Sequence, residues 1–301
     1  MKGCVGFIGL GAMGGRMARN VIKSGYDLWV YDVVPQSLTP VVGAGAHAAD
    51  SPRQVAERCD WIVLSLPDGG VVDQVLHGED GLRSAVREGQ IIVDCGTTDP
   101  TQTCELAGEL AAIGVAWLDA PVSGLDARAE DGTLTIMVGG DRGAFDQVLP
   151  LLRTMGELVV HMGPSGQGQL MKMTNNVLFN ISCAALAEIL PFAATLGLDP
   201  GKVRAVVGTS SGQSFGFDFF SERILEDDFE TGYKMRLAYK DMGNMMARAN
   251  QTRMPLPVTS ATMQTYQMAL AQGYGEESKA AMVKVWERAM DVNVREAAGK
   301  R

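Results

Sequence analysis

The hydrophobic pattern differs between the two halves of the chain. In the first half, short continuous apolar runs alternate with amphipathic stretches, and the runs end at turn residues or at aspartate. Such runs are typical of strands buried on both faces of a parallel sheet, and their alternation with helices predicts an α/β layer fold with right-handed crossovers. The predicted strands include residues 5–8, 28–31, 61–64, 91–93, 117–118 and 134–138, the predicted helices include 13–24 and 52–58, and the sheet extends to about residue 162.

Beyond the turn at residues 163–166, alanine, leucine and methionine dominate and β-branched runs become rare. Nine of the 17 methionines lie after residue 230, which favours a helical core over the alternative of a methionine-rich ligand groove. The first stretch, about residues 168–196, is long enough to be a helix joining two domains, and Pro191 is expected to kink or break it. We therefore predict a Rossmann-type dinucleotide-binding domain of residues 1–164 with a parallel sheet. An all-helical domain of residues 165–301 for substrate binding and oligomerisation follows it.

Composition narrows the class of protein. The chain has 301 residues, of which 46% are hydrophobic and 20% charged, as in a soluble globular enzyme of two domains. A net charge of −9 without a basic patch argues against nucleic acid as a partner. Five cysteines without close pairing and three widely spaced histidines predict reduced thiols and no metal site. The uncharged stretch 173–187 contains three asparagines and is expected to be too short and too polar for a membrane, so we expect a cytoplasmic protein.

A glycine-rich sequence stands between the first predicted strand and the first predicted helix. Gly9 permits a tight turn, Gly11 lets the backbone approach a pyrophosphate, and Gly14 lets helix and strand pack closely. The N–H groups and the positive dipole end of the helix would then bind phosphates. A glycine-rich turn without a ligand is the alternative. The residues expected to contact a dinucleotide here are Gly9, Leu10, Gly11, Ala12, Met13 and Gly14.

Asp32 ends the second predicted strand, where a carboxylate can accept a hydrogen bond from a ribose hydroxyl. The same carboxylate would repel the 2′-phosphate of NADP, and no Lys or Arg follows within the next twenty residues. We therefore expect NAD as the cofactor and NADP to be less favoured. The turns at 66–68, which include Pro67, and at 94–98 follow later strands, at the edge where open parallel sheets bind ligands. Ordinary strand-to-helix turns are the alternative for these two segments.

Two later segments carry polar residues suited to chemistry. Residues 119–124 read DAPVSG, and residues 163–168 read GPSGQG and lead into the long predicted helix. On that helix Lys172, Asn176 and Asn180 recur every four residues, so they project from one face toward a substrate or, alternatively, toward solvent. Apolar neighbours and the nearby helix start should lower the pKa of Lys172 toward working pH, as a general base requires.

Together and in this order, residues 6–14, 119–124, 163–176 and 240–242 resemble the β-hydroxyacid dehydrogenase family. Its members include 3-hydroxyisobutyrate dehydrogenase, tartronate semialdehyde reductase and, more distantly, 6-phosphogluconate dehydrogenase. The resemblance implies an active site in a cleft between the two domains. It implies Lys172 as general acid/base, Ser123 and Gly124 as ligands of the substrate carboxylate, and Asn176 as the residue orienting the reacting hydroxyl. It further implies Leu66, Thr97 and Lys240 as cofactor contacts, and Tyr233 stands where the family often has Phe.

The expected activity is NAD-dependent oxidation of the β-hydroxyl of a small 3-hydroxy acid, such as 3-hydroxyisobutyrate, to the semialdehyde. The alternatives are reduction of tartronate or succinate semialdehyde, L-serine 3-dehydrogenation, imine reduction, and a non-enzymatic cofactor-binding interaction protein. Imine reductases generally lack a lysine at the position of Lys172 and act on substrates without a carboxylate, so Lys172 favours the hydroxy acid. The resemblance also suggests a homodimer or homotetramer formed through the helical domain.

Leu125 departs from the family pattern, which usually has a second glycine after the serine. A leucine there is expected to lose a backbone conformation with positive φ, and its side chain should enter the substrate pocket or, alternatively, the core. The charged side chains of Asp126 and Arg128 follow closely, and either could meet a charged group of the substrate.

Overall fold

The computed structural model describes residues 2–299, and the chain divides after Lys172 into two compact units. The division falls inside the long helix α8 (Gln167–Thr195), because the first turns of that helix pack against residues of the first unit. Each unit has its own hydrophobic core. The second unit is helical, as the methionine-rich pattern predicts, and its core includes the fully buried Met235, Met242 and Met282.

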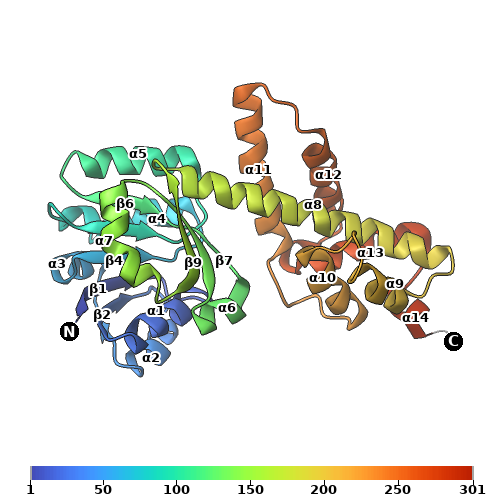
Figure 1. The fold of residues 1–301 in the computed structure, drawn as a ribbon, viewed down its shortest axis with the longest axis horizontal. Helices are drawn as coiled ribbons and strands as arrows, with labels where there is room; N and C mark the ends of the chain where they lie inside the picture. The colour runs from blue at the N-terminus through green and yellow to red at the C-terminus, as the bar shows by residue number, and fades with distance from the viewer. Residues whose placement is uncertain (1, 300–301) are drawn as a thin grey trace. The chain divides into compact units, whose positions relative to one another are not determined.

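A nine-stranded sheet organises the described part of the first unit (Figure 1). Six strands run parallel in the order β3-β2-β1-β4-β5-β6, which is the strand order of a Rossmann fold. The predicted strands all form, as β1 (Lys2–Ile8), β2 (Tyr26–Tyr31), β4 (Trp61–Leu64), β5 (Ile91–Asp94), β6 (Ala116–Asp119) and β8 (Leu134–Gly139).

Three further strands, β3 (His47–Ala48), β7 (Val122–Ser123) and β9 (Gly156–Gly163), are absent from the predicted set. Two of them have only two residues, and the apolar run of β9, residues 158–160, is mostly exposed, unlike the buried runs of the predicted strands. The predicted Rossmann-type parallel sheet is confirmed, and antiparallel pairing at one edge adds to it. Strand β8 runs antiparallel to β6 and β7, because the chain reverses between β7 and β8.

Alternating side chains bury both faces of the parallel strands, as their apolar runs predict. Val5 and Phe7 of β1 belong to the core cluster on one face, and Ile8 belongs to the cluster on the other. Helices cover the two faces (Figure 1). They are α1 (Gly14–Lys23), α2 (Pro35–Val42), α3 (Pro52–Arg58), α4 (Gly69–His77), α5 (Pro100–Ala111), α6 (Leu125–Asp131) and α7 (Arg142–Leu152), with a 3-10 turn η1 (Leu82–Ser84).

The second unit contains most of α8, which Figure 1 shows as one long helix. Of the two outcomes expected at Pro191, the break does not occur, because α8 continues through this residue while Leu186, Ala187 and Leu190 pack into the core; the kink stays a prediction. The antiparallel helices α11 and α12 pack along each other. The remaining elements are α9 (Pro200–Val207), α10 (Phe215–Leu225), α11 (Met235–Thr252), α12 (Pro257–Ala271), η2 (Tyr274–Glu276), η3 (Lys279–Met282), α13 (Val283–Met290) and α14 (Val294–Gly299).

Helix α8 contradicts the expectation that the uncharged segment 173–187 is too short and too polar to cross a membrane. It has 29 residues, and by length and composition alone it could cross a membrane. Half of its most apolar window is buried inside the protein. The core helix of a soluble protein has the same properties, so α8 is only weak evidence for a membrane span.

Candidate active site

The glycine-rich turn lies at the carboxyl edge of the parallel strands. Gly9 has φ of +91°, and a Cβ there would come within 2.4 Å of the Ser65 carbonyl oxygen. A Cβ on Gly14 would lie 2.0 Å from the Gly9 carbonyl oxygen, so side chains at these positions would force the turn apart. A Cβ on Gly11, in contrast, would meet nothing within 4 Å. The turn is therefore tightly packed at Gly9 and Gly14 and open at Gly11. A backbone that must approach a pyrophosphate closely requires this open side.

The N-terminus of α1 has no side-chain cap, as is also true of α2 and α6, whereas four other helices of the first unit have one. The side chains of Ser51, Asp68, Asp99 and Asp141 cap α3, α4, α5 and α7 by accepting hydrogen bonds from backbone N–H groups. Helix α1 follows Met13 without a side-chain cap and without an acidic residue in its first turn. Its first N–H groups and its positive dipole end are thus suited to phosphate oxygens.

Asp32 is held against this turn. Its Oδ2 accepts a hydrogen bond from the Leu10 N–H at 2.6 Å, and its Oδ1 accepts one from the Val34 N–H at 2.7 Å. Each carboxylate oxygen has a second lone pair, and the side chain is only partly buried, so it can also accept hydrogen bonds from ribose hydroxyls. The turn, the helix start and Asp32 together fit a dinucleotide.

The other predicted cofactor contacts in the first unit lie along the same edge. The backbone ladder continues one residue beyond each parallel strand, through bonds such as Ser65 N–H to the Ile8 carbonyl and Cys95 N–H to the Leu64 carbonyl. Leu66 lies beside Gly9, 3.0 Å from where a Cβ on that glycine would stand. Pro67 is exposed, and Thr97 is partly exposed. These loops are therefore brought to the glycine-rich turn by the sheet itself.

Beneath the loop that carries Thr97 lies the fully buried Asp94. Its carboxylate accepts hydrogen bonds from the Gly96 N–H at 2.9 Å and the Thr98 hydroxyl at 3.3 Å. Burial raises the pKa of Asp94 to about 6, and the nearby Asp119 carboxylate adds to the shift, while the two hydrogen bonds oppose it. The folded protein therefore holds a proton on Asp94 between pH 4 and 6 that the unfolded chain has released.

Because of this raised pKa, the free energy of unfolding is expected to depend on pH. The contribution of Asp94 to the unfolding free energy should fall by about 2 kcal/mol as the pH rises from 4 to 6. Asp94→Asn removes this titration. The unfolding free energy of the variant minus that of the wild type, measured by urea denaturation, should increase by about this amount between pH 4 and 7. A difference that does not change with pH would contradict the assignment.

The predicted carboxylate loop joins β7 to α6. Ser123 pairs with Thr135 of β8, and Gly124 has φ of +146°, where a Cβ would lie 2.8 Å from the Arg128 Cβ. Leu125 has φ of +59° and is partly exposed. The expected loss of a positive-φ conformation is therefore wrong, because the leucine adopts it. A non-glycine residue in this left-handed region costs roughly 1–2 kcal/mol.

The charged residues after Leu125 have partners within the protein. Asp126 lies 3.5 Å from Arg16 of α1, and Arg128 lies 3.7 Å from Glu157. Arg19 contacts Glu130, so salt bridges connect α6 to the cofactor-side helix α1. Asp126 and Arg128 thus pair with charged residues of the first unit, and contact of either one with a charged group of the substrate stays a prediction.

Leu125→Gly should change the substrate ranking and leave the fold intact. Glycine relieves the positive φ, so the loss of stability should stay well below the 2–5 kcal/mol typical of a truncated core leucine. If the side chain lines the substrate pocket, relative kcat/KM among 3-hydroxy acids should shift by about tenfold or more. Arg253→Gly is a matched control, because Arg253 has a φ of +57° at the end of α11. A large loss of stability with an unchanged ranking would place Leu125 in the core.

Lys172 lies on α8 and is partly exposed. The start of its helix is anchored by Asp119, a fully buried residue. The Asp119 carboxylate accepts hydrogen bonds from the Gly166 N–H at 2.8 Å and from the Gln169 N–H at 2.9 Å, one turn before Lys172. A Cβ on Gly168 would lie 2.3 Å from the Met137 carbonyl oxygen, so α8 approaches the sheet closely here.

In the second unit, Asp241 connects the remaining predicted residues. Its buried Oδ2 accepts hydrogen bonds from Asn176 Nδ2 at 2.9 Å and from the Tyr233 hydroxyl at 3.1 Å. Lys240 Nζ lies 3.5 Å from its Oδ1. Burial and this carboxylate raise the pKa of Tyr233 above its usual range, so the phenol remains a donor. Asp241 is absent from the residues predicted for the site, although its place beside Lys240 in residues 240–242 is a signal that could have indicated it.

Asn180 does not share the environment of Asn176. It is buried, its Oδ1 accepts a hydrogen bond from Lys279 Nζ at 2.9 Å, and its Nδ2 donates to the Ala238 carbonyl at 3.4 Å. Lys279 Nζ also lies 3.5 Å from the centre of the Phe179 ring. Asn180 therefore belongs to the helical core, and the predicted polar face of α8 is limited to Lys172 and Asn176.

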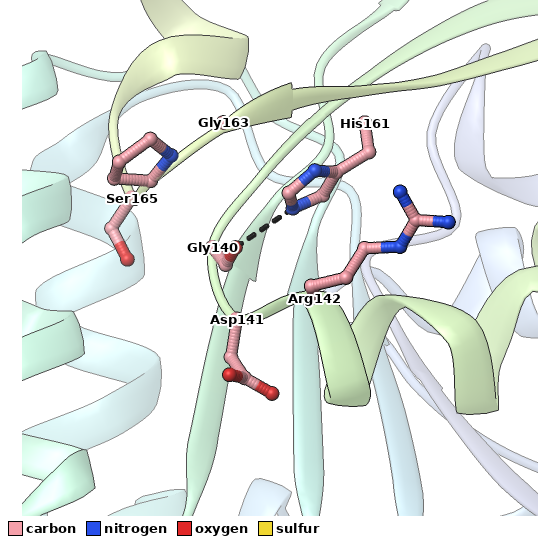
Figure 2. A pocket seen from close by; sticks show the side chains of 7 residues that line it. Gly140, Asp141, Arg142, His161, Gly163 and Ser165 are labelled. Atoms are coloured by element: carbon pink, nitrogen blue, oxygen red, sulfur yellow. Dashed lines mark hydrogen bonds between the residues drawn. The ribbon is translucent and has the colours of Figure 1, made fainter.

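A separate open pocket of about 430 Å³ lies in the first unit (Figure 2). The His161 imidazole Nε2 lies 2.9 Å from the Gly140 carbonyl oxygen, and Arg142 and Asp141 stand at the start of α7. The pocket is also lined by Gly163, Pro164 and Ser165, and no predicted catalytic, substrate-binding or cofactor-binding residue lines it. Among residues 2–299 there is no cluster of three or more His, Cys, Asp or Glu side chains that could hold a metal ion.

Two family models together match most of the chain. Residues 4–163 match the NAD-binding domain of 6-phosphogluconate dehydrogenase, and residues 166–286 match the NAD-binding region of NADP-dependent 3-hydroxyisobutyrate dehydrogenase. The first match spans the glycine-rich turn and Asp32, and the second spans α8 and Asp241.

Full-length relatives agree with these models. The chain is 38% identical over 291 residues to 2-(hydroxymethyl)glutarate dehydrogenase of Eubacterium barkeri, covering 96% of this chain and 97% of that one. It is 36% identical to human mitochondrial 3-hydroxyisobutyrate dehydrogenase, covering 91% and 83% of the two chains. It is 34% identical to 2-hydroxy-3-oxopropionate reductase of Escherichia coli K12, covering 94% and 97%.

Solved structures show the same architecture. A 3-hydroxyisobutyrate dehydrogenase from Salmonella typhimurium has a TM-score of 0.87 at 30% identity, covering 94% of this chain and 100% of that one. The Mycobacterium tuberculosis 3-hydroxyisobutyrate dehydrogenase with L-serine has a TM-score of 0.85 at 27% identity, covering 94% and 99%. An imine reductase from Pseudomonas sp. shares the fold, with a TM-score of 0.60 at 20% identity and coverage of 95% and 99%. The chain therefore belongs to the β-hydroxyacid dehydrogenase family and is an NAD(P)-dependent oxidoreductase that acts on hydroxyl groups.

Proposed function

We propose that this enzyme uses NAD to oxidise the β-hydroxyl of a small 3-hydroxy acid to the semialdehyde, with Lys172 as the general base. The observation that carries the proposal is the polar face of α8, on which Lys172 and Asn176 stand one turn apart, with the Asn176 amide held by Asp241. A lysine followed by an oriented amide suits removal of a hydroxyl proton. The names of the relatives, two dehydrogenases of hydroxy acids and one reductase of a hydroxy-oxo acid, support the substrate class.

In the proposed reaction each side chain has a separate task. The Ser123 hydroxyl and the backbone N–H groups of the adjacent loop bind the carboxylate. Asn176 Nδ2 carries two N–H groups; Asp241 accepts a hydrogen bond from one, and the other donates to the reacting oxygen. Neutral Lys172 takes the hydroxyl proton as the C–H bond breaks, and returns a proton in the reverse direction. The residues that would hold NAD are those of the glycine-rich turn, Asp32, Leu66, Pro67, Thr97 and Lys240, and bound NAD accepts the hydride.

A substrate panel tests the proposal. Purified enzyme with NAD should form NADH, followed at 340 nm, with at least one of 3-hydroxyisobutyrate, L-serine and 2-(hydroxymethyl)glutarate. Oxidation of NADH by 2-hydroxy-3-oxopropionate or succinate semialdehyde, without detectable forward turnover, would instead favour a reductase. Saturable NADH binding without turnover of any of these compounds would favour a non-enzymatic cofactor-binding protein. A homodimer or homotetramer and a cytoplasmic location stay predictions.

A further inference from the structure

Gln169 connects the start of α8 with the loop after β5. These two parts of the first unit have different tasks in the proposed function. It is fully buried, and its side-chain amide pairs with the backbone of the loop after β5. Its Oε1 accepts a hydrogen bond from the Thr98 N–H at 3.2 Å, and its Nε2 donates to the Gly96 carbonyl at 2.9 Å. The two bonds enclose Thr97, the residue of this loop expected to contact NAD.

The same glutamine stands three residues before Lys172, within the first turn of α8. Its own backbone N–H donates to the Asp119 carboxylate, which also accepts from the Gly166 N–H. On the other side of the loop, the Asp94 carboxylate accepts from the Gly96 N–H and the Thr98 hydroxyl. Two buried carboxylates thus fix the helix start and the loop, and Gln169 is the side chain that joins one to the other.

We propose that Gln169 is a positioning residue that sets the separation between the NAD-contacting loop and the general base. The inference rests on the proposed function, in which Thr97 contacts NAD and Lys172 takes the proton. Both hydrogen bonds of Gln169 go to backbone atoms, so they fix the path of the loop and not only one side chain. A displacement of about 1 Å between reacting groups can lower a rate by about 10²-fold, so a clamp of this kind has a measurable effect on turnover.

Gln90 offers a matched control in the same unit. It is also buried, its Nε2 donates to the carbonyls of Ala56 and Cys59 at 2.7 Å each, and its Oε1 accepts from the Arg87 N–H at 2.6 Å. It precedes β5, at the amino end of the strand, whereas the loop held by Gln169 follows the carboxyl end. Gln90→Met and Gln169→Met remove the same type of contact at opposite ends of one strand.

The experiment compares the two variants with the wild type by urea denaturation, NADH fluorescence titration and kcat. Both variants should lose stability. Gln169→Met alone should raise the Kd for NADH about tenfold and lower kcat by about 10- to 100-fold. Gln90→Met should leave both within about twofold. Wild-type Kd and kcat in Gln169→Met, or equal changes in Gln90→Met, would overturn the inference.

Gln169→Glu keeps the inference testable if Gln169→Met does not fold. The glutamate retains the acceptor for the Thr98 N–H and loses the donor to the Gly96 carbonyl, so the Kd for NADH should rise by about threefold or more. An unchanged Kd in a folded Gln169→Glu variant would overturn the inference. NADH binding needs no substrate, so this comparison decides on Gln169 even if no 3-hydroxy acid is turned over, an outcome that would contradict the proposed function alone.

Discussion

Lys172→Ala should lower kcat for oxidation of a 3-hydroxy acid by about 10²- to 10⁴-fold, because positioned acid–base groups contribute rate enhancements of this size. The Kd for NADH should change little, since the lysine serves proton transfer and not binding of the pyrophosphate. In the wild type, kcat/KM for oxidation should rise with pH as a single group loses its proton, with a pKa below the ordinary lysine value of about 10.4. The variant should lack this rise.

Lys202→Ala is the control for Lys172→Ala. Lys202 lies exposed on α9, so its replacement should leave kcat and the pH profile unchanged. Activity of Lys172→Ala within tenfold of the wild type would remove this lysine from its assigned role. An unchanged pH profile in Lys172→Ala would do the same.

The wild type should prefer NAD over NADP by at least about tenfold in kcat/KM, equivalent to about 1.4 kcal/mol. The Asp32 carboxylate, held by the N–H groups of Leu10 and Val34, favours a free 2′-hydroxyl and repels a 2′-phosphate. Asp32→Ser combined with Val33→Arg should narrow the preference by about tenfold or more. The Val33 side chain is 79% exposed, so an arginine there can extend without disturbing the core.

The single variant Val33→Arg separates the effect of the added cation from the effect of removing the Asp32 carboxylate. It supplies a cation while Asp32 keeps its charge, so it should improve NADP use less than the double variant does. Initial rates over a range of each cofactor, at saturating substrate, measure the preference. A wild type that favours NADP would contradict the assignment to Asp32.

The sequence predicted the Rossmann part of the fold because each of its signals is local. Apolar runs such as 61–64 and the glycine pattern of residues 9–14 report on burial and on tight turns within a few residues. The location of the cofactor contacts at one edge of the sheet follows from a general rule: the carboxyl ends of parallel strands lie together at the same edge. The structure adds the geometry that explains it, such as the 2.0 Å approach that excludes a side chain at Gly14.

The features that escaped prediction depend on contacts between distant segments. Asp241 meets Asn176 across 65 positions of sequence, and Gln169 meets the loop after β5 across more than 70. No pattern in the neighbouring sequence indicates that the side-chain amide of a glutamine forms hydrogen bonds with the backbone of a distant loop. The positive φ of Leu125 is likewise not visible in the local sequence, because it occurs in a loop whose helix α6 is connected to α1 by salt bridges. That α8 does not break at Pro191 also depends on distant contacts, because residues on both sides of this helix segment pack into the helical core.

Transfer of deuterium to the nicotinamide tests the central claim most directly. The enzyme is incubated with NAD and, in turn, 3-hydroxyisobutyrate, L-serine and 2-(hydroxymethyl)glutarate deuterated at the carbinol carbon, and the reduced cofactor is analysed by mass spectrometry. The proposed reaction predicts NADH carrying one deuterium with at least one of these acids, and none with Lys172→Ala on the same time scale. An enzyme that binds NAD and transfers no deuterium from any of them would contradict the claim that it oxidises a small 3-hydroxy acid.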